Sequence, residues 1–124
     1  MHPDLVQGVV SFNGTANHLE YENYQDAIIA SFGGTKQEIP EEYKRRSAEY
    51  WPERFTMPVA VTTGGQDTSV PPDSCTRLVA VLKKLNPNVL QMHQPEGGHS
   101  TTHEDSLAAC EYVCELVLNS EASE

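Results

Sequence analysis

The chain has 124 residues, of which 38% are apolar, and these values predict one globular domain with an adequate core. Eighteen acidic and eight basic residues give a formal charge of −10, which repels nucleic acid phosphates and anionic membrane surfaces. No stretch approaches the roughly 20 apolar residues of a membrane span, and the first residues lack the features of a signal peptide. We therefore expect a soluble protein with no nucleic acid or membrane partner, and its compartment stays open.

The first half of the chain predicts one strand and two helices. Residues 5–12 form a short, valine-rich run that an Asn-Gly dipeptide ends, which is typical of a strand buried on both faces. Residues 17–34 place several apolar side chains on one helical face, and two glycines end this helix. Residues 40–51 predict a charged helix that begins with proline and has glutamate–arginine pairs at i,i+4.

The second half alternates between strands and helices. Residues 57–63 predict a second strand, which the sequence GGQDTSVPP follows. Residues 73–85 predict an amphipathic helix, and residues 88–93 predict a third strand. A Pro-Glu-Gly-Gly turn then leads to a capping-box pattern and a last helix that we expect to end near residue 118.

The helices of the second half have predictable buried faces. In the helix of residues 73–85, the apolar stripe comprises Cys75, Leu78, Val79, Leu82 and Leu85. In the last helix, the expected stripe comprises Leu107, Cys110, Cys114 and Val117. All three cysteines of the chain lie in these stripes, so we expect reduced thiols in the core.

Strands that alternate with helices predict a parallel sheet with right-handed crossovers, which is an α/β fold in three layers. Ligands of such sheets bind at the carboxyl ends of the strands. Asp67 follows the second strand and His99 follows the third, so we expect both side chains at this edge. A carboxylate beside a histidine accepts the Nδ1–H of the ring, selects its tautomer and stabilises the imidazolium. Gly64 and Gly65 allow the sharp turn that leads to Asp67.

These motifs resemble the closing half of an α/β-hydrolase. The pattern G-x-x-D at residues 64–67, V-P at residues 70–71 and G-G-H at residues 97–99 is similar to serine peptidases and esterases of the prolyl oligopeptidase type. Three further stretches resemble the same family: HPDL at residues 2–5, GGT at residues 33–35 and PEEYKRRS at residues 40–47. The resemblance covers residues 2–118.

The resemblance implies that residues 1–118 form a partial α/β-hydrolase domain and that residues 119–124 are a polar tail. Its short parallel sheet, of about three strands with flanking helices, is equivalent to the C-terminal half of that fold. By the same resemblance, Asp67 is the acid and His99 the base of a catalytic triad that transfers an acyl group to water. The implied substrate is a small ester or a peptide, bound only in a complete enzyme, and no cofactor or metal is implied.

The nucleophile of that family is a serine in a G-x-S-x-G turn, and these 124 residues do not contain this motif. The nearest sequence is IASFG at residues 29–33, which includes Ser31 but lacks the first glycine. The oxyanion-hole donors of the family are also missing. We therefore expect a chain that carries the triad acid and base of a serine hydrolase and is inactive alone.

A partial sheet has an unpaired edge. In the implied hydrolase order, the strand at residues 5–12 has a free edge where the nucleophile half would pair. This edge is apolar and contains no lysine or proline, the residues that commonly protect exposed edges. Helices that lack their partners should also expose apolar patches. We expect a homodimer, formed through the first-strand edge or through exposed helix faces.

Two other interpretations stay open. His99 with His103, and Cys110 with Cys114, form i,i+4 pairs that zinc accepts, although the spacing matches no common zinc module. Alternatively, Asp67 stabilises a turn and His99 begins a helix in an unrelated parallel α/β domain. The chain would then be a non-catalytic binding or interaction module that self-associates without turnover.

Overall fold

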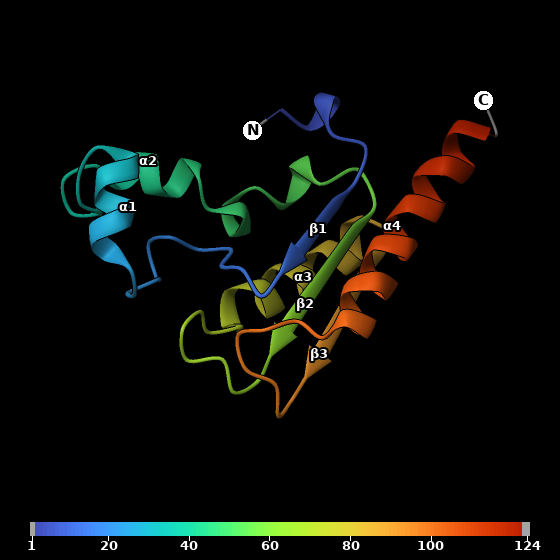
Figure 1. Cartoon of the computed structure of the whole chain (residues 1–124). Helices are drawn as coiled ribbons and strands as arrows, with labels where there is room; N and C mark the ends of the chain where they lie inside the picture. Colours follow the sequence, from blue (N-terminus) through green and yellow to red (C-terminus); the bar gives the residue numbers. More distant parts are fainter. Residues whose placement is uncertain (1, 123–124) are drawn as a thin grey trace.

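The computed structural model describes residues 2–122, and its centre is a parallel three-stranded sheet (Figure 1). The strands are β1 (Val9–Phe12), β2 (Val59–Gly64) and β3 (Val89–Gln94), in the order β1-β2-β3. Val9 pairs with Val59, which in turn pairs with Val89. The predicted α/β fold with a short parallel sheet is therefore confirmed.

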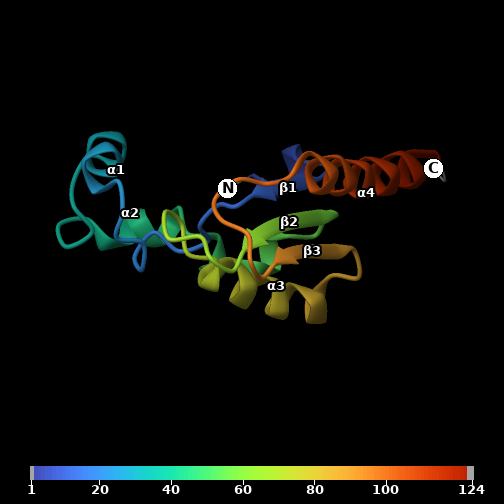
Figure 2. The same cartoon turned by 60° about the horizontal axis from the view of Figure 1, so that its bottom comes forward.

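Helices lie on both faces of the sheet. Four α-helices are present in residues 2–122: α1 (Gln25–Phe32), α2 (Pro40–Arg45), α3 (Asp73–Leu85) and α4 (His103–Ala122). Figure 2 shows α3 against one face of the sheet and α4 against the other, which gives the three layers. The helices α1 and α2 lie together beside this body, as Figure 1 shows. None of the helices in the described residues is both long and apolar enough to cross a membrane.

The central strand β2 is buried along its whole length because its two faces supply two different cores. Side chains alternate between the faces of a strand, so Val59 and Val61 pack toward α3 while Ala60 packs toward α4. The core on the α3 side also contains Cys75, Leu78, Val79 and Leu82. The core on the α4 side contains Ala109 and Val113. The continuous apolar run in the sequence reflects this burial on both faces.

The first strand is shorter than predicted. Strand β1 begins at Val9, and Pro3–Leu5 forms a turn of 3₁₀-helix, as Pro3 favours at a helix start. Gly8 lies directly against α4, where a Cβ atom would overlap a methyl group of Val113. Gly8 therefore lets the chain pass close to α4 immediately before β1.

The predicted helix of residues 17–34 begins only at Gln25. The side-chain oxygen of Asn17 accepts the backbone N–H groups of Leu19 and Glu20, each at 3.0 Å. Such local bonds compete with helical ones, so the segment before α1 forms a loop. The predicted glycine stop is confirmed, because Gly33 ends α1 with a φ of 94° and its N–H donates to Ile29 O.

The charged helix predicted over residues 40–51 ends at Arg45. Ser47 is fully buried, and its hydroxyl donates to Tyr43 O at 2.6 Å and accepts the backbone N–H of His18 at 2.8 Å. The chain turns at this point to bury Ser47, and Ala48–Tyr50 then forms a turn of 3₁₀-helix. The hydroxyl therefore connects the loop before α1 to the end of α2.

The stripe predicted for the last helix is wrong for Leu107 and Cys114, whereas Val117 is partly buried and packs against the core on the α4 side. The residues of α4 that are buried against the sheet are Ala109 and Val113, whereas Leu107 and Cys114 are exposed. Ala109 is fully buried in the same cluster as Ala60, and Tyr112 and Val117 pack against that cluster. The three cysteines are free, as expected, but only Cys75 is a core residue.

Two further expectations about helix ends need correction. Helix α4 continues to Ala122, past the expected end near residue 118 and into the predicted polar tail of residues 119–124. The last two residues of that tail lie outside the described residues. In α3 the predicted bounds of 73–85 are confirmed, but Leu85, the last residue of the predicted stripe, is 60% exposed.

A matched pair of substitutions in α3 tests this packing. Leu82 is fully buried, so Leu82→Ala should lower the free energy of unfolding by about 2–5 kcal/mol through lost burial and a residual cavity. Leu85→Ala removes the same atoms from an exposed position and should change stability by less than about 1 kcal/mol. Urea denaturation measures both values. Equal losses for the two variants would contradict the described orientation of α3.

Candidate acid–base site

Two loops meet at the carboxyl ends of β2 and β3 with almost no side chains between them. The N–H of Gly65 donates to Gln94 O, and the N–H of Gln66 donates to Gly97 O, both at 2.8 Å. A Cβ atom on Gly64 would lie 2.6 Å from Gly97 O, closer than real Cβ atoms approach an oxygen. Glycine is therefore required at this position for the two loops to pack.

Asp67 and His99 meet across this contact. The side chain of Asp67 is 1% exposed, and its Oδ2 lies 3.0 Å from Nδ1 of His99. Its Oδ1 accepts the backbone N–H of Val70 at 2.9 Å, so both carboxylate oxygens are bonded. The ring of His99 is 53% exposed, and within residues 2–122 its Nε2 makes no hydrogen bond. A buried carboxylate thus orients a ring whose second nitrogen is accessible.

The structure adds a buried polar group that the sequence analysis treated only as a turn residue. Asn13 follows β1, is 5% exposed and has a φ of 50°. Its Nδ2 donates to Gly98 O at 2.9 Å, and its Oδ1 lies 2.7 Å from Thr62 Oγ1 and 2.8 Å from Thr101 Oγ1. The signal that could have found it is its place at the carboxyl end of a strand, where Asp67 and His99 also lie.

The segment that precedes α1 is attached to the loop that carries Asp67. The hydroxyl of Tyr21 donates to Ser69 O at 2.8 Å, and Nδ2 of Asn23 donates to the same oxygen at 2.8 Å. Burial raises the pKa of Tyr21, and the nearby Tyr24 and Asp67 raise it further. The loop of Asp67 is therefore supported from the β1 side as well as from β3.

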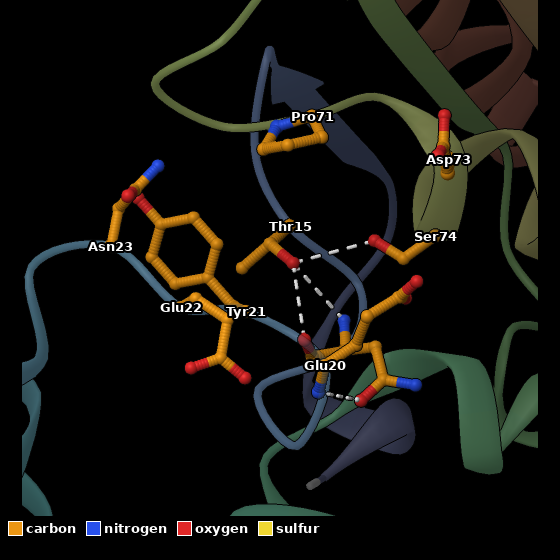
Figure 3. Close-up of a pocket in the computed structure, with 9 residues that line it drawn as sticks. Thr15, Glu20, Tyr21, Glu22, Asn23, Pro71, Asp73 and Ser74 are labelled. Atoms are coloured by element: carbon orange, nitrogen blue, oxygen red, sulfur yellow. Dashed lines mark hydrogen bonds between the residues drawn. The ribbon is translucent and has the colours of Figure 1, made fainter.

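A cavity of about 200 Å³ lies beside this attachment (Figure 3). Its walls come from residues 15–23 and from residues 71–74, where Thr15 Oγ1 and Ser74 Oγ lie 3.3 Å apart. Two of its carboxylates are already paired, since Glu20 bonds to Arg77 and Glu22 bonds to Lys36. The carboxylates of Glu20 and Glu22 at the cavity are thus ion-paired.

Arg77 of α3 attaches the cavity wall that contains Glu20 to this helix. It bonds to Glu20 and also to Glu49, whose Oε2 lies 2.6 Å from the Arg77 Nε. The hydrogen bond from Arg77 is the main reason that the pKa of Glu49 is lowered. Asn17 Nδ2 donates to the same carboxylate at 2.9 Å, so one ion-paired cluster connects the loop after β1, the turn at Ala48–Tyr50 and α3.

The other residues considered from the sequence do not join this site. Ser31 lies exposed in α1, which is far from the loops after β2 and β3 in Figure 1. His103 begins α4, and Cys110 and Cys114 lie further along that helix. In residues 2–122, no group of three or more histidine, cysteine, aspartate or glutamate side chains could hold a metal ion.

A parallel sheet between two helical layers, with an aspartate–histidine pair at its carboxyl edge, is the arrangement of the α/β-hydrolase fold. The family model described as the prolyl oligopeptidase family matches residues 1–115. The chain therefore belongs to the prolyl oligopeptidase family, as its resemblance indicated. No curated protein matches the chain.

Solved structures agree with this fold. A puromycin hydrolase superposes with a TM-score of 0.72 at 19% identity, over 94% of this chain and 18% of that one. The acylaminoacyl peptidase of Pyrococcus horikoshii gives a TM-score of 0.63 at 18% identity, over 88% of this chain and 18% of that one. The monoacylglycerol lipase of Paleococcus ferrophilus gives 0.56 at 20% identity, over 94% and 60%. This chain thus spans less than a fifth of the length of the puromycin hydrolase and of the acylaminoacyl peptidase.

A pair of glycine substitutions tests the contact between the loops. Gly64→Ala should lower the free energy of unfolding by about 1–3 kcal/mol, because the new methyl group would overlap the backbone of Gly97 and Gly98. Gly98→Ala is the control, because a Cβ atom at that position meets nothing within 4 Å. Thermal and urea denaturation measure both effects. A neutral Gly64→Ala variant would show that the loops are further apart.

Proposed function

We propose that this chain supplies the acid–base half of a serine hydrolase site, with His99 as general base and acid and Asp67 as the residue that orients it. The observation that carries this proposal is the 3.0 Å contact between Asp67 Oδ2 and His99 Nδ1, made by a buried carboxylate to a ring with an accessible Nε2. With its proton on Nδ1, the ring has a lone pair on Nε2 that can accept a proton.

The reaction is acyl transfer to water. Nε2 of His99 takes the hydroxyl proton of a serine as the serine oxygen attacks a substrate carbonyl, and Asp67 stabilises the resulting imidazolium. Nε2 then gives this proton to the leaving alcohol or amine as the acyl-enzyme forms. Water enters, loses a proton to Nε2 and attacks the acyl-enzyme, and the proton returns to the serine as the acid is released. No cofactor takes part in these steps.

The substrate class is a small ester or a peptide. The solved structures with this fold include proteins named as a puromycin hydrolase, an acylaminoacyl peptidase and a monoacylglycerol lipase. Amide and ester bonds break through the same tetrahedral intermediate, so the Asp67–His99 pair serves either. Substrate binding requires the complete site, because the serine and the oxyanion donors are not among these 124 residues.

The polypeptide segment that carries the nucleophile would pair with the free edge of β1, the first strand in the order β1-β2-β3. On the β2 side, the N–H of Val9 donates to Pro58 O at 2.9 Å, and the N–H of Asn13 donates to Thr62 O at 3.1 Å. Because alternate N–H groups of a strand point to opposite sides, those of Val10 and Phe12 point to the unpaired edge. A polypeptide segment with a G-x-S-x-G turn can add a parallel strand there and bring its serine to the same edge as His99.

Reconstitution tests this proposal. This chain is mixed with a polypeptide that carries the G-x-S-x-G half of a prolyl oligopeptidase-family domain, and hydrolysis of a p-nitrophenyl ester is followed. Activity should appear only in the mixture, and Asp67→Asn should lower kcat by about 10⁴-fold, because the ring loses its correct tautomer. Asp73→Asn, in the first turn of α3, is the matched control and should leave kcat unchanged.

Two results would refute the proposal. One is a reconstituted enzyme with Asp67→Asn that is as active as the parent. The other is turnover by this chain alone that a serine-directed phosphonate blocks, which would point to Ser31 as an unrecognised nucleophile.

A second function rests on the same free edge, which a second copy of the chain can occupy. Exposed apolar side chains flank it: Leu5 is 77% exposed and Phe12 is 46% exposed. Helix α4 also presents Leu107 and Leu118, which are 51% and 63% exposed. Strand edges and apolar faces of this kind favour self-association. The homodimer would then be the form that the chain adopts without its nucleophile half. Alternatively, the chain would act as a non-catalytic interaction module that self-associates.

Light scattering with two variants distinguishes the routes to a dimer. Val10→Pro removes an N–H at the free edge and should give monomers if the dimer forms through β1. Leu118→Asp should give monomers if it forms through α4. Circular dichroism confirms that each variant is folded. A parent chain that is wholly monomeric at micromolar concentration would refute self-association.

A further inference from the structure

Asn13 has an unusual position for a buried polar residue. It directly follows β1, and its N–H donates to Thr62 O at 3.1 Å, so it still pairs with β2. Its φ of 50° lies in the left-handed region, which asparagine adopts more readily than most residues. The chain therefore turns at Asn13 while its side chain stays 5% exposed, beneath the loop that carries His99.

The side-chain amide of Asn13 is hydrogen-bonded to a residue that precedes His99 and to a residue that follows it. Nδ2 donates to the carbonyl of Gly98, the residue before the histidine, at 2.9 Å. Oδ1 lies 2.8 Å from the hydroxyl of Thr101, two residues after it, and 2.7 Å from that of Thr62 in β2. The two hydroxyls are also 2.8 Å apart, which closes a small network at the ends of all three strands.

Packing does little to hold this part of the loop. His99 is 53% exposed, and a Cβ atom on Gly98 would meet nothing within 4 Å. A single hydrogen bond to Asp67 has to offset the conformational entropy of ordering the loop. The loop before Gly98 is bonded to the loop of Asp67 through Gly97 O, whereas Gly98 and Thr101 are bonded to Asn13, and Thr101 also lies beside Thr62.

We propose that Asn13 is a positioning residue that holds residues 98–101 so that Nδ1 of His99 faces Asp67. This inference rests on the proposed function of the Asp67–His99 pair. An asparagine amide donates and accepts at the same time, as Gly98 O and the two threonine hydroxyls require. Aspartate would lack the donor, and glycine would keep the backbone turn while losing both groups. The effect on chemistry is indirect, through the tautomer of His99.

The ring tautomer of His99 provides a readout that a purely structural role would not change. The complete 124-residue chain is labelled with ¹⁵N, and its histidine ring signals are recorded by NMR, with His99→Gln identifying the signals of His99. The parent should show His99 protonated on Nδ1, because Asp67 accepts that proton. Asn13→Gly should lose this Nδ1–H signal and approach the spectrum of Asp67→Asn.

Two threonine variants form a matched control. Thr101→Val removes one hydroxyl from the network at nearly constant volume and should shift the His99 signals in the same direction as Asn13→Gly. Thr101→Ser keeps the hydroxyl and should restore the parent spectrum. Thr68→Val removes an exposed hydroxyl next to Asp67, outside the network, and should leave the spectrum unchanged. If Asn13→Gly does not fold, Thr101→Val and Thr101→Ser decide the question.

The outcomes separate this inference from the proposed function. If Asp67→Asn changes the His99 signals while Asn13→Gly and Thr101→Val keep those of the parent, the positioning role is overturned and the Asp67–His99 pair stands. If the parent itself gives the spectrum of Asp67→Asn, the pair is not formed, and both the proposed function and the inference fail. Loss of the Nδ1–H signal in Asn13→Gly and Thr101→Val, with the parent spectrum in Thr101→Ser, supports the role of Asn13.

Discussion

The direct contact between the backbones that follow β2 and β3 is the constraint on which the acid–base site depends. Gly64 and Gly65 leave no side chain between the two loops, so hydrogen bonds join them directly. Asp67 is buried by this contact, and burial of a carboxylate is costly unless its oxygens are bonded. The N–H of Val70 and the ring of His99 satisfy both oxygens. The same packing that buries Asp67 therefore also places His99 beside it.

Strand β2 connects this site to the core. Its first residues pack against α3 and α4 on its two faces, while Thr62 and Thr63 near its end are 2% and 3% exposed and direct hydroxyls into polar networks. Thr62 lies beside Asn13, and Thr63 Oγ1 lies 2.8 Å from His93 Nδ1. The apolar residues that fix β2 in the core therefore also fix the positions of the Thr62 and Thr63 hydroxyls at its carboxyl end. Strand β1 lies at the edge of the sheet, and α4 carries the exposed side chains Leu107 and Leu118.

The two helices that cover the sheet differ in how far local sequence defines their bounds and buried faces. The bounds of α3 follow from local chemistry, because prolines precede it, lysines occupy its last turn and its apolar stripe is continuous. Helix α4 has apolar side chains around much of its circumference, so periodicity did not identify the buried face. Ala109 and Val113 face the sheet because Gly8 and Ala60 allow a close approach there, and this depends on residues about 50 to 100 positions away.

The sequence by itself determined the α/β class, the parallel sheet, the family resemblance and the pair Asp67 and His99, because strand periodicity and glycine-rich turns are local signals. Parallel strands bring their carboxyl ends to one edge, so the proximity of these two residues followed from chain order. Only the tertiary structure decided the hydrogen bonds of Asn13, the face of α4 that is buried and the bonding of both carboxylate oxygens. These features depend on contacts between segments distant in sequence, and hydrogen-bond partners across such distances leave no periodic pattern to read.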